Sequence, residues 1–416
     1  MAPAPPPVDV SALSPALDRH VLVHVSGHDQ PGVTAALMSH LAAAGAEVAD
    51  VELITVRGRL HLSVLIGLRA EQEQPLLKEL LLMGWQRGFH IDFEAVSADH
   101  HATRKAPWFA VTVLGQPLGS DAMAAATGAI AAHGANIERI TCLARYPVSA
   151  YELVISAADI APIREQLMSA SRRLRFDVAV QPEGLRRRGI RLVALDVDST
   201  LIQDEVIELL ADEAGCREEV ARVTAAAMAG ELDFEAALRA RVALLEGLEE
   251  EVLERARKRL RLTPGARTFV RTLKRLGFCT MIVSGGFTQF TDALKDELDL
   301  DYAFANQLEI VDGKLTGRVL GAVVDRRRKA EILAEVARAE GLAMHQTVAV
   351  GDGANDLDML AAAGLGVAFN AKPVVADAAD TSLNVPYLDA VLFVLGIRRD
   401  DVEAADAAPP DPITAG

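Results

Sequence analysis

The stretch Ile190-Arg191-Leu192-Val193-Ala194-Leu195-Asp196-Val197-Asp198-Ser199-Thr200 decides the fold of the chain. Residues 190–195 form an apolar run with the length and composition of a buried parallel strand. Asp196 and Asp198 follow directly, and because residues two apart on an extended chain point the same way, both carboxylates can face one small space. Burying two carboxylates costs free energy unless a cation and hydrogen bonds compensate. On this stretch alone, an acidic strand-to-helix turn without a catalytic role is an open alternative.

Two further apolar strands end in polar turns of the same kind. Residues 279–283 lead into Ser284-Gly285-Gly286, and residues 347–350 lead into Gly351-Asp352-Gly353-Ala354-Asn355-Asp356. Helical stretches separate these strands, which predicts a parallel sheet with alternating helices. Ligands bind at the carboxyl ends of the strands in such sheets. We therefore expect the three turns to meet at one edge, which favours a functional site over a structural turn.

The groups expected at this edge suit phosphate chemistry. Several carboxylates close together require a hard cation with oxygen ligands, and Mg²⁺ near a phosphate is the standard case. Ser284, Lys329 and main-chain N–H groups can hold phosphoryl oxygens, and one carboxylate can then attack phosphorus. The sequence has no GxxxxGK[ST] motif, so a P-loop nucleotide site is not supported. The carboxylates are those of Asp196, Asp198, Asp352 and Asp356.

Composition narrows the class of protein. A chain of 416 residues is expected to form two to three domains. Its formal net charge of −16 argues against a partner that is a nucleic acid or an anionic membrane. The three cysteines are scattered without metal-ligand spacing, and the first residues lack the pattern of a signal peptide. These features predict a soluble cytoplasmic protein.

An internal repeat occupies roughly residues 18–182, ahead of the central stretch. Each copy has the element order βαββαβ of a ferredoxin-like unit, over residues 18–97 and 107–182. In the first copy, Asp29-Gln30-Pro31-Gly32 joins the first strand to the first helix, and Gln116-Pro117-Leu118-Gly119 stands in its place in the second. A glycine there lets a ligand carboxylate approach free N–H groups at a helix N-terminus, although plain turn chemistry is an alternative for both loops.

The remaining boundaries follow from composition and periodicity. Residues 1–17 are rich in Pro and Ala and are predicted to be disordered. Residues 190–398 are predicted to form the parallel-sheet domain, with an almost purely helical insert at about 204–262. Residues 399–416 are predicted to be a flexible tail. The expected fold class is α/β: two ferredoxin-like units precede a Rossmann-like parallel-sheet domain with a helical cap.

These residues resemble known families. Both repeat copies resemble ACT domains, which are small-molecule regulatory modules of amino-acid metabolism, and the second copy departs from their loop signature. Residues 190–398 resemble the haloacid-dehalogenase-like phosphatases along their full length. The motifs behind this resemblance are DxDxT at 196–200, Ser284 after a hydrophobic strand, the downstream Lys329, and GDxxxD at 351–356. Closer matches to the phosphoserine phosphatases are DVDSTLIQDE, residues 228–234, Arg239-Ala240-Arg241-Val242, VSGGF, GDGAND and FNAKP.

The resemblance implies a role for each matching residue. Asp196 would be the nucleophile, and Asp198 the general acid and then the general base. Mg²⁺ would be held by Asp196, the Asp198 carbonyl and Asp352, with Asp356 in support. The residues implied at the substrate are Ser284, Gly285, Lys329 and Asn355 around the phosphoryl group, and Glu205, Met228, Phe234 and Arg241 from the cap, with Thr200 as a supporting residue.

The implied activity is hydrolysis of O-phospho-L-serine to L-serine and phosphate through an aspartyl-phosphate, the final step of serine biosynthesis. The ACT-like units imply regulation by serine, with Gly32 and Gly119 as candidate effector-binding positions, and a homodimer. Two alternatives are open. One is a phosphatase or phosphotransferase acting on another small phosphomonoester, and the other is a non-enzymatic amino-acid sensor whose phosphatase-like domain is inactive.

Overall fold

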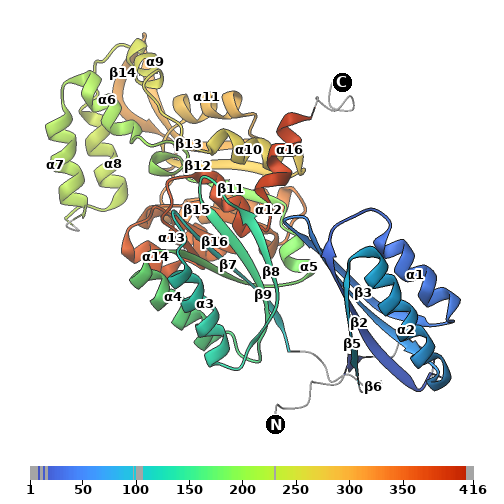
Figure 1. The fold of residues 1–416 in the computed structure, drawn as a ribbon. Coiled ribbons are helices and arrows are strands. Elements are labelled where there is room, and N and C mark those ends of the chain that lie inside the picture. The colour runs from blue at the N-terminus through green and yellow to red at the C-terminus, as the bar shows by residue number, and fades with distance from the viewer. Residues whose placement is uncertain are drawn as a thin grey trace. The chain divides into compact units, whose positions relative to one another are not determined.

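The computed structural model describes residues 8–9, 13–14, 17–96, 98–99, 106–228 and 231–408 (Figure 1). The chain divides into two compact units, Met1–Lys105 and Ala106–Gly416. Most of the segment predicted to be disordered, residues 1–17, lies outside the described residues. In the described parts of the chain, no helix has both the length and the apolar composition needed to cross a membrane.

The first unit is a four-stranded antiparallel sheet covered by two helices, in the predicted order βαββαβ. Its strand order is β3-β4-β2-β5, with the short parallel pair β1 and β6 formed separately. Alternate residues of β2 are buried, because one face of the sheet packs on the helices through side chains such as Val23, Leu37 and Leu80. The elements are β1 (Val8–Asp9), β2 (Arg19–His28), α1 (Val33–Ala43), β3 (Glu47–Val56), β4 (Arg59–Leu68), α2 (Ala70–Arg87), β5 (His90–Ala95) and β6 (Ala98–Asp99).

The second unit begins with the second ferredoxin-like module, which has the strand order β10-β7-β9-β8. Its helices α3 and α4 lie side by side on one face (Figure 1). A short helix, α5, then leads into the parallel-sheet domain. The elements are β7 (Trp108–Gly115), α3 (Ser120–Ala132), β8 (Asn136–Ala144), β9 (Ser149–Ser156), α4 (Ala161–Leu174), β10 (Asp177–Pro182) and α5 (Leu185–Arg188).

The rest of the second unit is the predicted α/β domain, whose insert forms a group of helices at the β14 side of the sheet (Figure 1). Its strands are β11 (Leu192–Leu195), β12 (Cys279–Phe287), β13 (Tyr302–Val311), β14 (Lys314–Leu320), β15 (Thr347–Gly351), β16 (Leu365–Phe369) and β17 (Thr381–Leu383). Its helices are α6 (Val206–Ala214), α7 (Arg217–Met228), α8 (Phe234–Ala243), α9 (Glu251–Arg257), α10 (Ala266–Arg275), α11 (Thr288–Leu298), α12 (Arg326–Ala339), α13 (Leu357–Ala362), α14 (Pro373–Ala378), α15 (Val391–Val394) and α16 (Arg399–Ala407).

One continuous sheet runs through the whole second unit, in the order β14-β13-β12-β11-β15-β16-β17-β10-β7-β9-β8. Strands β13, β12, β11, β15, β16 and β17 are parallel, whereas β14 pairs antiparallel with β13, and β17 pairs antiparallel with β10 of the ferredoxin-like module. This junction rests on only two residue pairs, Val178 with Ser382 and Ala179 with Thr381. The second module is therefore built into the sheet of the parallel domain.

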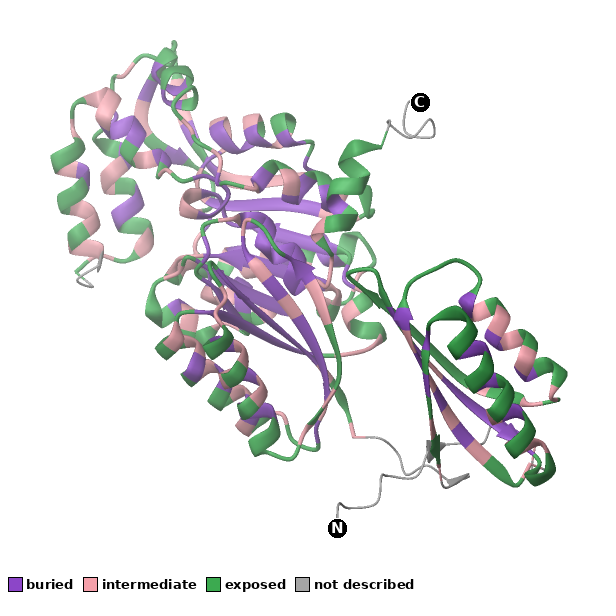
Figure 2. Cartoon of the chain, in the orientation of Figure 1, coloured by how far each residue is buried: buried purple, intermediate pink, exposed green. Residues whose placement is uncertain are grey.

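Side-chain packing strengthens this junction. A single apolar cluster includes Leu114 and Val148 of the ferredoxin-like module together with Phe393 of the parallel domain, and the strands of this region are largely buried (Figure 2). A buried ion cluster lies beside it, in which Arg187 contacts Glu152 at 2.5 Å and Glu183 at 2.9 Å. Buried charges are tolerated when they are paired in this way. The module and the parallel domain thus share both a sheet and a core.

One local prediction was wrong. The tail expected to be flexible from residue 399 is helical as far as Ala407. That helix, α16, is fixed because Val402 is 3% exposed and Asp406 pairs with arginines of α10. Residues 409–416 of the predicted tail lie outside the described residues.

Candidate active site

The three polar turns meet at one edge of the central sheet, as the sequence predicts. Leu195 of β11 stands beside Ile282 of β12 and Val350 of β15 in parallel register, so the residues that follow these positions emerge together. The N–H of Asp196 also donates to the carbonyl of Val350 at 2.9 Å, which fixes the start of the first turn. The strand register alone therefore brings the DVDST, SGG and GDGAND turns to one place.

A fully buried lysine holds two of the acidic side chains. Lys329 Nζ, from α12, lies 2.5 Å from Oδ1 of Asp196 and 2.7 Å from Oδ1 of Asp356. Burial alone lowers the pKa of Lys329, but the two carboxylates outweigh burial and raise it, so the ammonium stays charged. Burial, followed by the charge of Asp356, raises the pKa of Asp196 well above its usual range.

The carboxylates at this edge fit a divalent cation. Asp196, Asp352 and Asp356 each offer an oxygen, and these oxygens all lie within 4.8 Å of one another. Thr200 Oγ1 donates to Asp352 Oδ1 at 3.2 Å. Burial and the charge of Asp356 raise the pKa of Asp352 to about 6. These oxygens, with Asp198 beside them and one ammonium group to balance them, form the hard and negatively charged donor set that Mg²⁺-type ions prefer.

Asp198 is held in a fixed orientation. Its Oδ1 accepts from the N–H of Val206 at 2.7 Å, and its Oδ2 accepts from Ser284 Oγ at 3.0 Å. Ser284 Oγ in turn accepts from the N–H of Gly286 at 2.7 Å. Burial raises the pKa of Asp198, while these hydrogen bonds act in the opposite direction. A carboxyl of this kind can exchange a proton with a bound group.

The edge opens into a cavity of about 630 Å³ between the sheet and the helical cap. The cap contributes a charged pair, Glu205 before α6 and Arg241 in α8, and both line the cavity. Burial, followed by the charge of Asp198, raises the pKa of Glu205 to about 7, although Ser199 Oγ donates to it at 2.8 Å. Burial lowers the pKa of Arg241 below its usual value, and Nε of Arg241 donates to the carbonyl of Ala237 at 3.2 Å.

Phe234 and Gly285 meet at the same cavity. A Cβ added to Gly285 would lie 3.0 Å from the Phe234 ring, so only glycine leaves this approach unstrained. Asn355 also lines the cavity, and the N–H of Gly353 donates to Asp356 Oδ2 at 3.0 Å. Met228 ends α7, and its side chain lies outside the described part of the chain.

Sequence reasoning missed two residues at the site. Asn306 is 1% exposed, donates from Nδ2 to the carbonyl of Gly285 at 2.8 Å and accepts from the N–H of Val324 at 2.8 Å, which fixes the glycine turn. It lies inside an ordinary strand, so no sequence signal marks it. Lys372 also lines the cavity. Lys372 belongs to the FNAKP stretch. Because this stretch follows a buried strand of the sheet, its position could have indicated that Lys372 lies at the site.

The two candidate effector loops differ in conformation. Gly32 forms the N-cap of α1 with a left-handed φ of 90° and has open space where a Cβ would lie. Gly119 forms the N-cap of α3 with a φ of −78°, and a Cβ there would lie 2.3 Å from the carboxylate of Asp121. The backbone of the first loop therefore favours glycine, whereas in the second loop only the exposed side chain of Asp121 would have to move. Ligand binding at either loop stays a prediction.

Comparison with protein families identifies three matching regions. Residues 193–361 match the haloacid dehalogenase-like hydrolase family, and residues 19–94 and 108–181 each match an ACT domain. These matches confirm the predicted resemblances and the predicted fold class.

Known proteins are similar over almost the whole chain. A phosphoserine phosphatase of Streptomyces coelicolor is 54% identical over 94% of this chain and 95% of its own length. A phosphoserine phosphatase of Mycobacterium tuberculosis is 47% identical over 93% of this chain and 95% of its own length.

Solved structures agree with these relatives. The crystal structure of a probable phosphoserine phosphatase from Vibrio cholerae is 38% identical, with a TM-score of 0.56 over 73% of this chain and 90% of its own. A hydrolase of the haloacid dehalogenase family from Salmonella enterica serovar Typhi is 30% identical, with a TM-score of 0.61 over 69% of this chain and 98% of its own. The chain therefore belongs to the phosphoserine phosphatases of the haloacid dehalogenase-like hydrolase family.

Proposed function

We propose that the chain hydrolyses O-phospho-L-serine to L-serine and phosphate with the help of Mg²⁺. One observation carries the proposal: a single cavity is lined by the acidic site of Asp196, which Lys329 holds from beneath, and also by Glu205 and Arg241. A phosphomonoester needs the first set of groups, and the ammonium and carboxylate of an amino acid need the second. A general phosphatase would gain nothing from an acid and a guanidinium of the cap that both line the cavity.

Each end of the substrate has a defined partner in this proposal. The phosphoryl group lies against Asp196, with Lys329, the Gly285 N–H and Asn355 as donors. The Ser284 hydroxyl, which donates to Asp198 in the structure, turns toward the same oxygens. At the cap, Arg241 binds the substrate carboxylate and Glu205 binds its ammonium group. The apolar Phe234 covers the reacting atoms and keeps water away from them.

The reaction then proceeds in two displacements. A carboxylate oxygen of Asp196 attacks phosphorus, the bond from phosphorus to the serine oxygen breaks, and Asp198 gives that oxygen its proton. Asp198 next accepts a proton from a water molecule, whose oxygen attacks the aspartyl-phosphate and releases phosphate. Lys329 offsets the negative charge that develops in both transition states.

A divalent cation would be held by Asp196, the Asp198 carbonyl and Asp352, with Asp356 in support, and would neutralise charge on the phosphoryl oxygens. Mg²⁺ is the ion that we propose, since every donor is a hard oxygen and the substrate is a phosphate. The three cysteines of the chain are free thiols, which supports a reducing, cytoplasmic setting.

The proposal is tested by phosphate release from O-phosphoserine with and without Mg²⁺. Asp196→Asn keeps the shape but removes the attacking charge, so turnover should fall by at least about a thousandfold. The matched control is Asp296→Asn, an exposed aspartate of α11 that should leave turnover unchanged. Substantial activity in Asp196→Asn would exclude this nucleophile. Equal turnover of phosphorylated sugars and phosphoserine would favour the alternative of another phosphomonoester.

We also propose that serine regulates the enzyme through the Gly32 loop and that the enzyme is a homodimer. Strand β3 is at the edge of its sheet and exposes apolar side chains, which favours pairing with a second copy. Sedimentation should give the mass of a dimer, and Ile54→Lys should shift it toward the monomer. A monomeric wild-type protein would overturn this assembly. The exposed side chains are Val48, Val51, Leu53, Ile54 and Val56.

A further inference from the structure

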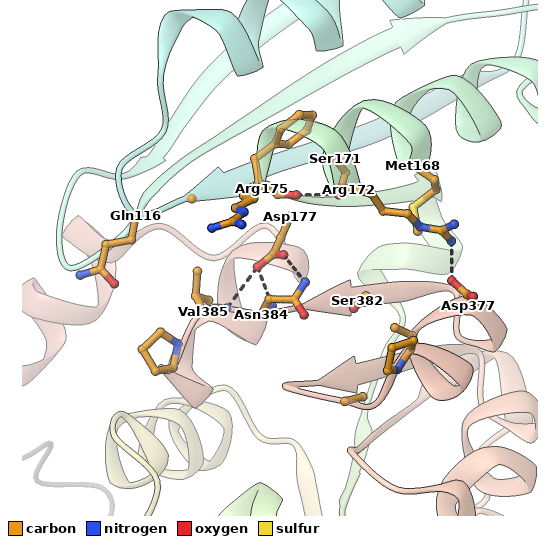
Figure 3. Close-up of a pocket in the computed structure, with 16 residues that line it drawn as sticks. Gln116, Met168, Ser171, Arg172, Arg175, Asp177, Asp377, Ser382, Asn384 and Val385 are labelled. Atoms are coloured by element: carbon orange, nitrogen blue, oxygen red, sulfur yellow. Dashed lines mark hydrogen bonds and ion pairs between the residues drawn. The ribbon is translucent and has the colours of Figure 1, made fainter.

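A second cavity, of about 590 Å³, lies in the second unit between the second ACT domain and the phosphatase domain (Figure 3). The loop after β7 and the end of α4 form one wall, with Gln116 and Arg175. Helix α14, strand β17 and the segment after it form the other wall, with Ala376, Ser382 and Val385. The cavity shares no lining residue with the active-site cavity.

The cavity contains a buried carboxylate that no cation neutralises among the described residues. Asp177 is 3% exposed, and its oxygens accept from Asn384 Nδ2 at 2.7 Å, the Asn384 N–H at 2.7 Å and the Val385 N–H at 3.2 Å. These donors are all uncharged amides. A carboxylate has about four acceptor positions, so one remains for a ligand.

A positive group lies close to this carboxylate. Arg175 follows α4, and Figure 3 shows its guanidinium pointing into the space between Gln116 and Asp177. Within the described parts of the chain, Arg175 makes no ion pair. Its neighbour Arg172 differs, because it pairs with Asp377 at the rim of the cavity. The cavity thus presents one positive and one negative group, and neither is neutralised by an ion pair.

Ser382 contributes a buried hydroxyl group at the cavity. It lines the cavity and is 9% exposed, and its Oγ is buried without a hydrogen-bond partner among the described residues. Burying a hydroxyl without a partner costs free energy, and a rotation about χ1 of Ser382 would bring this hydroxyl to a polar ligand in the cavity. Met168, Pro373 and Pro386 supply apolar surface in the same cavity.

From these groups we propose that the cavity binds a zwitterionic α-amino acid and that the ligand acts on the active site. The ligand carboxylate pairs with Arg175, and its ammonium group donates to Asp177 and Ser382. An uncharged ligand or a simple anion would leave one of the two protein charges unpaired. The site is distinct from the Gly32 loop, which belongs to the first unit.

The segment after β16 provides the link to the active site. Ala371 and Pro373 line the amino-acid cavity, while the intervening Lys372 and the following Val374 line the active-site cavity. A ligand that prefers one arrangement of residues 370–374 therefore changes the affinity for substrate, and substrate changes the affinity for the ligand by the same factor. This second step rests on the proposed phosphatase activity.

Binding is tested first, on the full-length protein. Calorimetry with each standard L-amino acid as the probe should find at least one that binds. Arg175→Gln and Ser382→Ala should each weaken that binding about tenfold, because each removes a charged or charge-assisted hydrogen bond. Arg173→Gln and Thr381→Val are the matched controls. Arg173 is exposed on α4 and does not line the cavity, and Thr381 Oγ1 is likewise buried and unpaired but lies outside the cavity lining.

The control variants distinguish a specific loss of amino-acid binding from a general effect of mutation on the protein. Absence of binding by every amino acid would overturn the site, and so would an equal loss of affinity in the test and control variants. The ligand chemistry is checked with the amide and the hydroxy acid that match the bound amino acid. Each lacks one charge, and each should bind at least about tenfold more weakly. Undiminished binding of either analogue would overturn the zwitterion assignment.

Coupling is tested with two readouts, so that failure of the proposed activity can be told apart. The bound amino acid should slow amide hydrogen exchange in residues 370–378, whether or not the protein is active. It should also change kcat/KM for phosphoserine in the wild type, and Ser382→Ala should need about tenfold more of it for the same change. Unchanged exchange despite tight binding would overturn the coupling, whereas changed exchange without any turnover would contradict only the phosphatase activity.

Discussion

Lys329 Nζ lies 2.5 Å from Asp196 Oδ1, although 133 positions separate the two residues in the sequence. The same ammonium group reaches Asp356. Lys329 therefore joins the end of the first strand to the last polar turn, and it supplies positive charge at the site even without a cation. The contact therefore stabilises the folded site, and in the proposed mechanism the same ammonium group offsets charge on the phosphoryl group.

Lys329→Met should lower both stability and turnover. It leaves buried carboxylates without their partner, so the free energy of unfolding should fall by about 3–5 kcal/mol in metal-free buffer. Saturating Mg²⁺ should restore part of this loss, because a cation that binds the folded state stabilises it. Denaturant titrations with and without Mg²⁺ measure the effect, and Lys258→Met, at an exposed lysine of the cap, is the control. Unchanged stability would show that the ion pairs contribute little.

Arg241→Ala should separate substrate specificity from phosphate chemistry. If the guanidinium binds the substrate carboxylate, kcat/KM for phosphoserine should fall by at least about a hundredfold. The value for an aryl phosphate, which has no carboxylate, should change little. Arg239→Ala, at an exposed arginine paired with Glu235 on the same helix, is the control. Equal losses on both substrates would assign Arg241 a structural role or a contact with phosphate.

Glu205 should give the enzyme a pH dependence that only an ammonium-bearing substrate reveals. Its pKa is raised to about 7, so the carboxyl is largely neutral below that pH and carries its charge above it. Because the charged form binds the ammonium group, kcat/KM for phosphoserine should rise as pH increases through about 7 and then level off. Phosphoglycolate lacks the ammonium group. Its kcat/KM at each pH therefore serves as the reference for the titration of groups other than Glu205. If kcat/KM for phosphoserine rises with pH in the same way in Glu205→Gln, Glu205 does not bind the ammonium group.

The strand ends of the catalytic domain could be predicted because local sequence determines them. An apolar run followed by Asp196, Ser284 or Asp352 indicates a buried strand and a polar turn without knowledge of any distant contact. The position of Asn306 could not be predicted in this way, since its partners are two main-chain groups that only the folded sheet brings near it. The family resemblance, in contrast, pointed to Lys329 despite its distance along the chain.

The pairing of β10 with β17 could not be predicted from the sequence either. Two residue pairs leave no periodic signal, and both strands read equally well as edges of separate sheets. The helix α16 was missed because its sequence is acidic and rich in alanine, and its stability depends on Val402 and on the pairing of Asp406 with α10. The exact boundaries of the modules stay predictions.

Gly32→Val should abolish inhibition by serine if the first loop is the effector site. The valine side chain would block the approach of a carboxylate to the N-terminus of α1, and no residue of the phosphatase domain would be changed. Gly45→Val, at the other end of α1 with a similar positive φ of 68°, controls for backbone strain. Initial rates with and without serine measure the effect. Serine inhibition that persists in a folded Gly32→Val protein would point to product binding at the Asp196 site.

The shared sheet of the second unit limits where the chain can be cut. A truncation between α5 and β11 would remove β10 and leave the main-chain N–H and C=O groups of β17 unpaired along a new edge. It would also uncover part of the apolar cluster that Phe393 shares with Leu114 and Val148. An unpaired edge beside an exposed apolar patch promotes aggregation. A catalytic fragment for expression should therefore start before Trp108, so that β7 to β10 remain attached to the phosphatase domain.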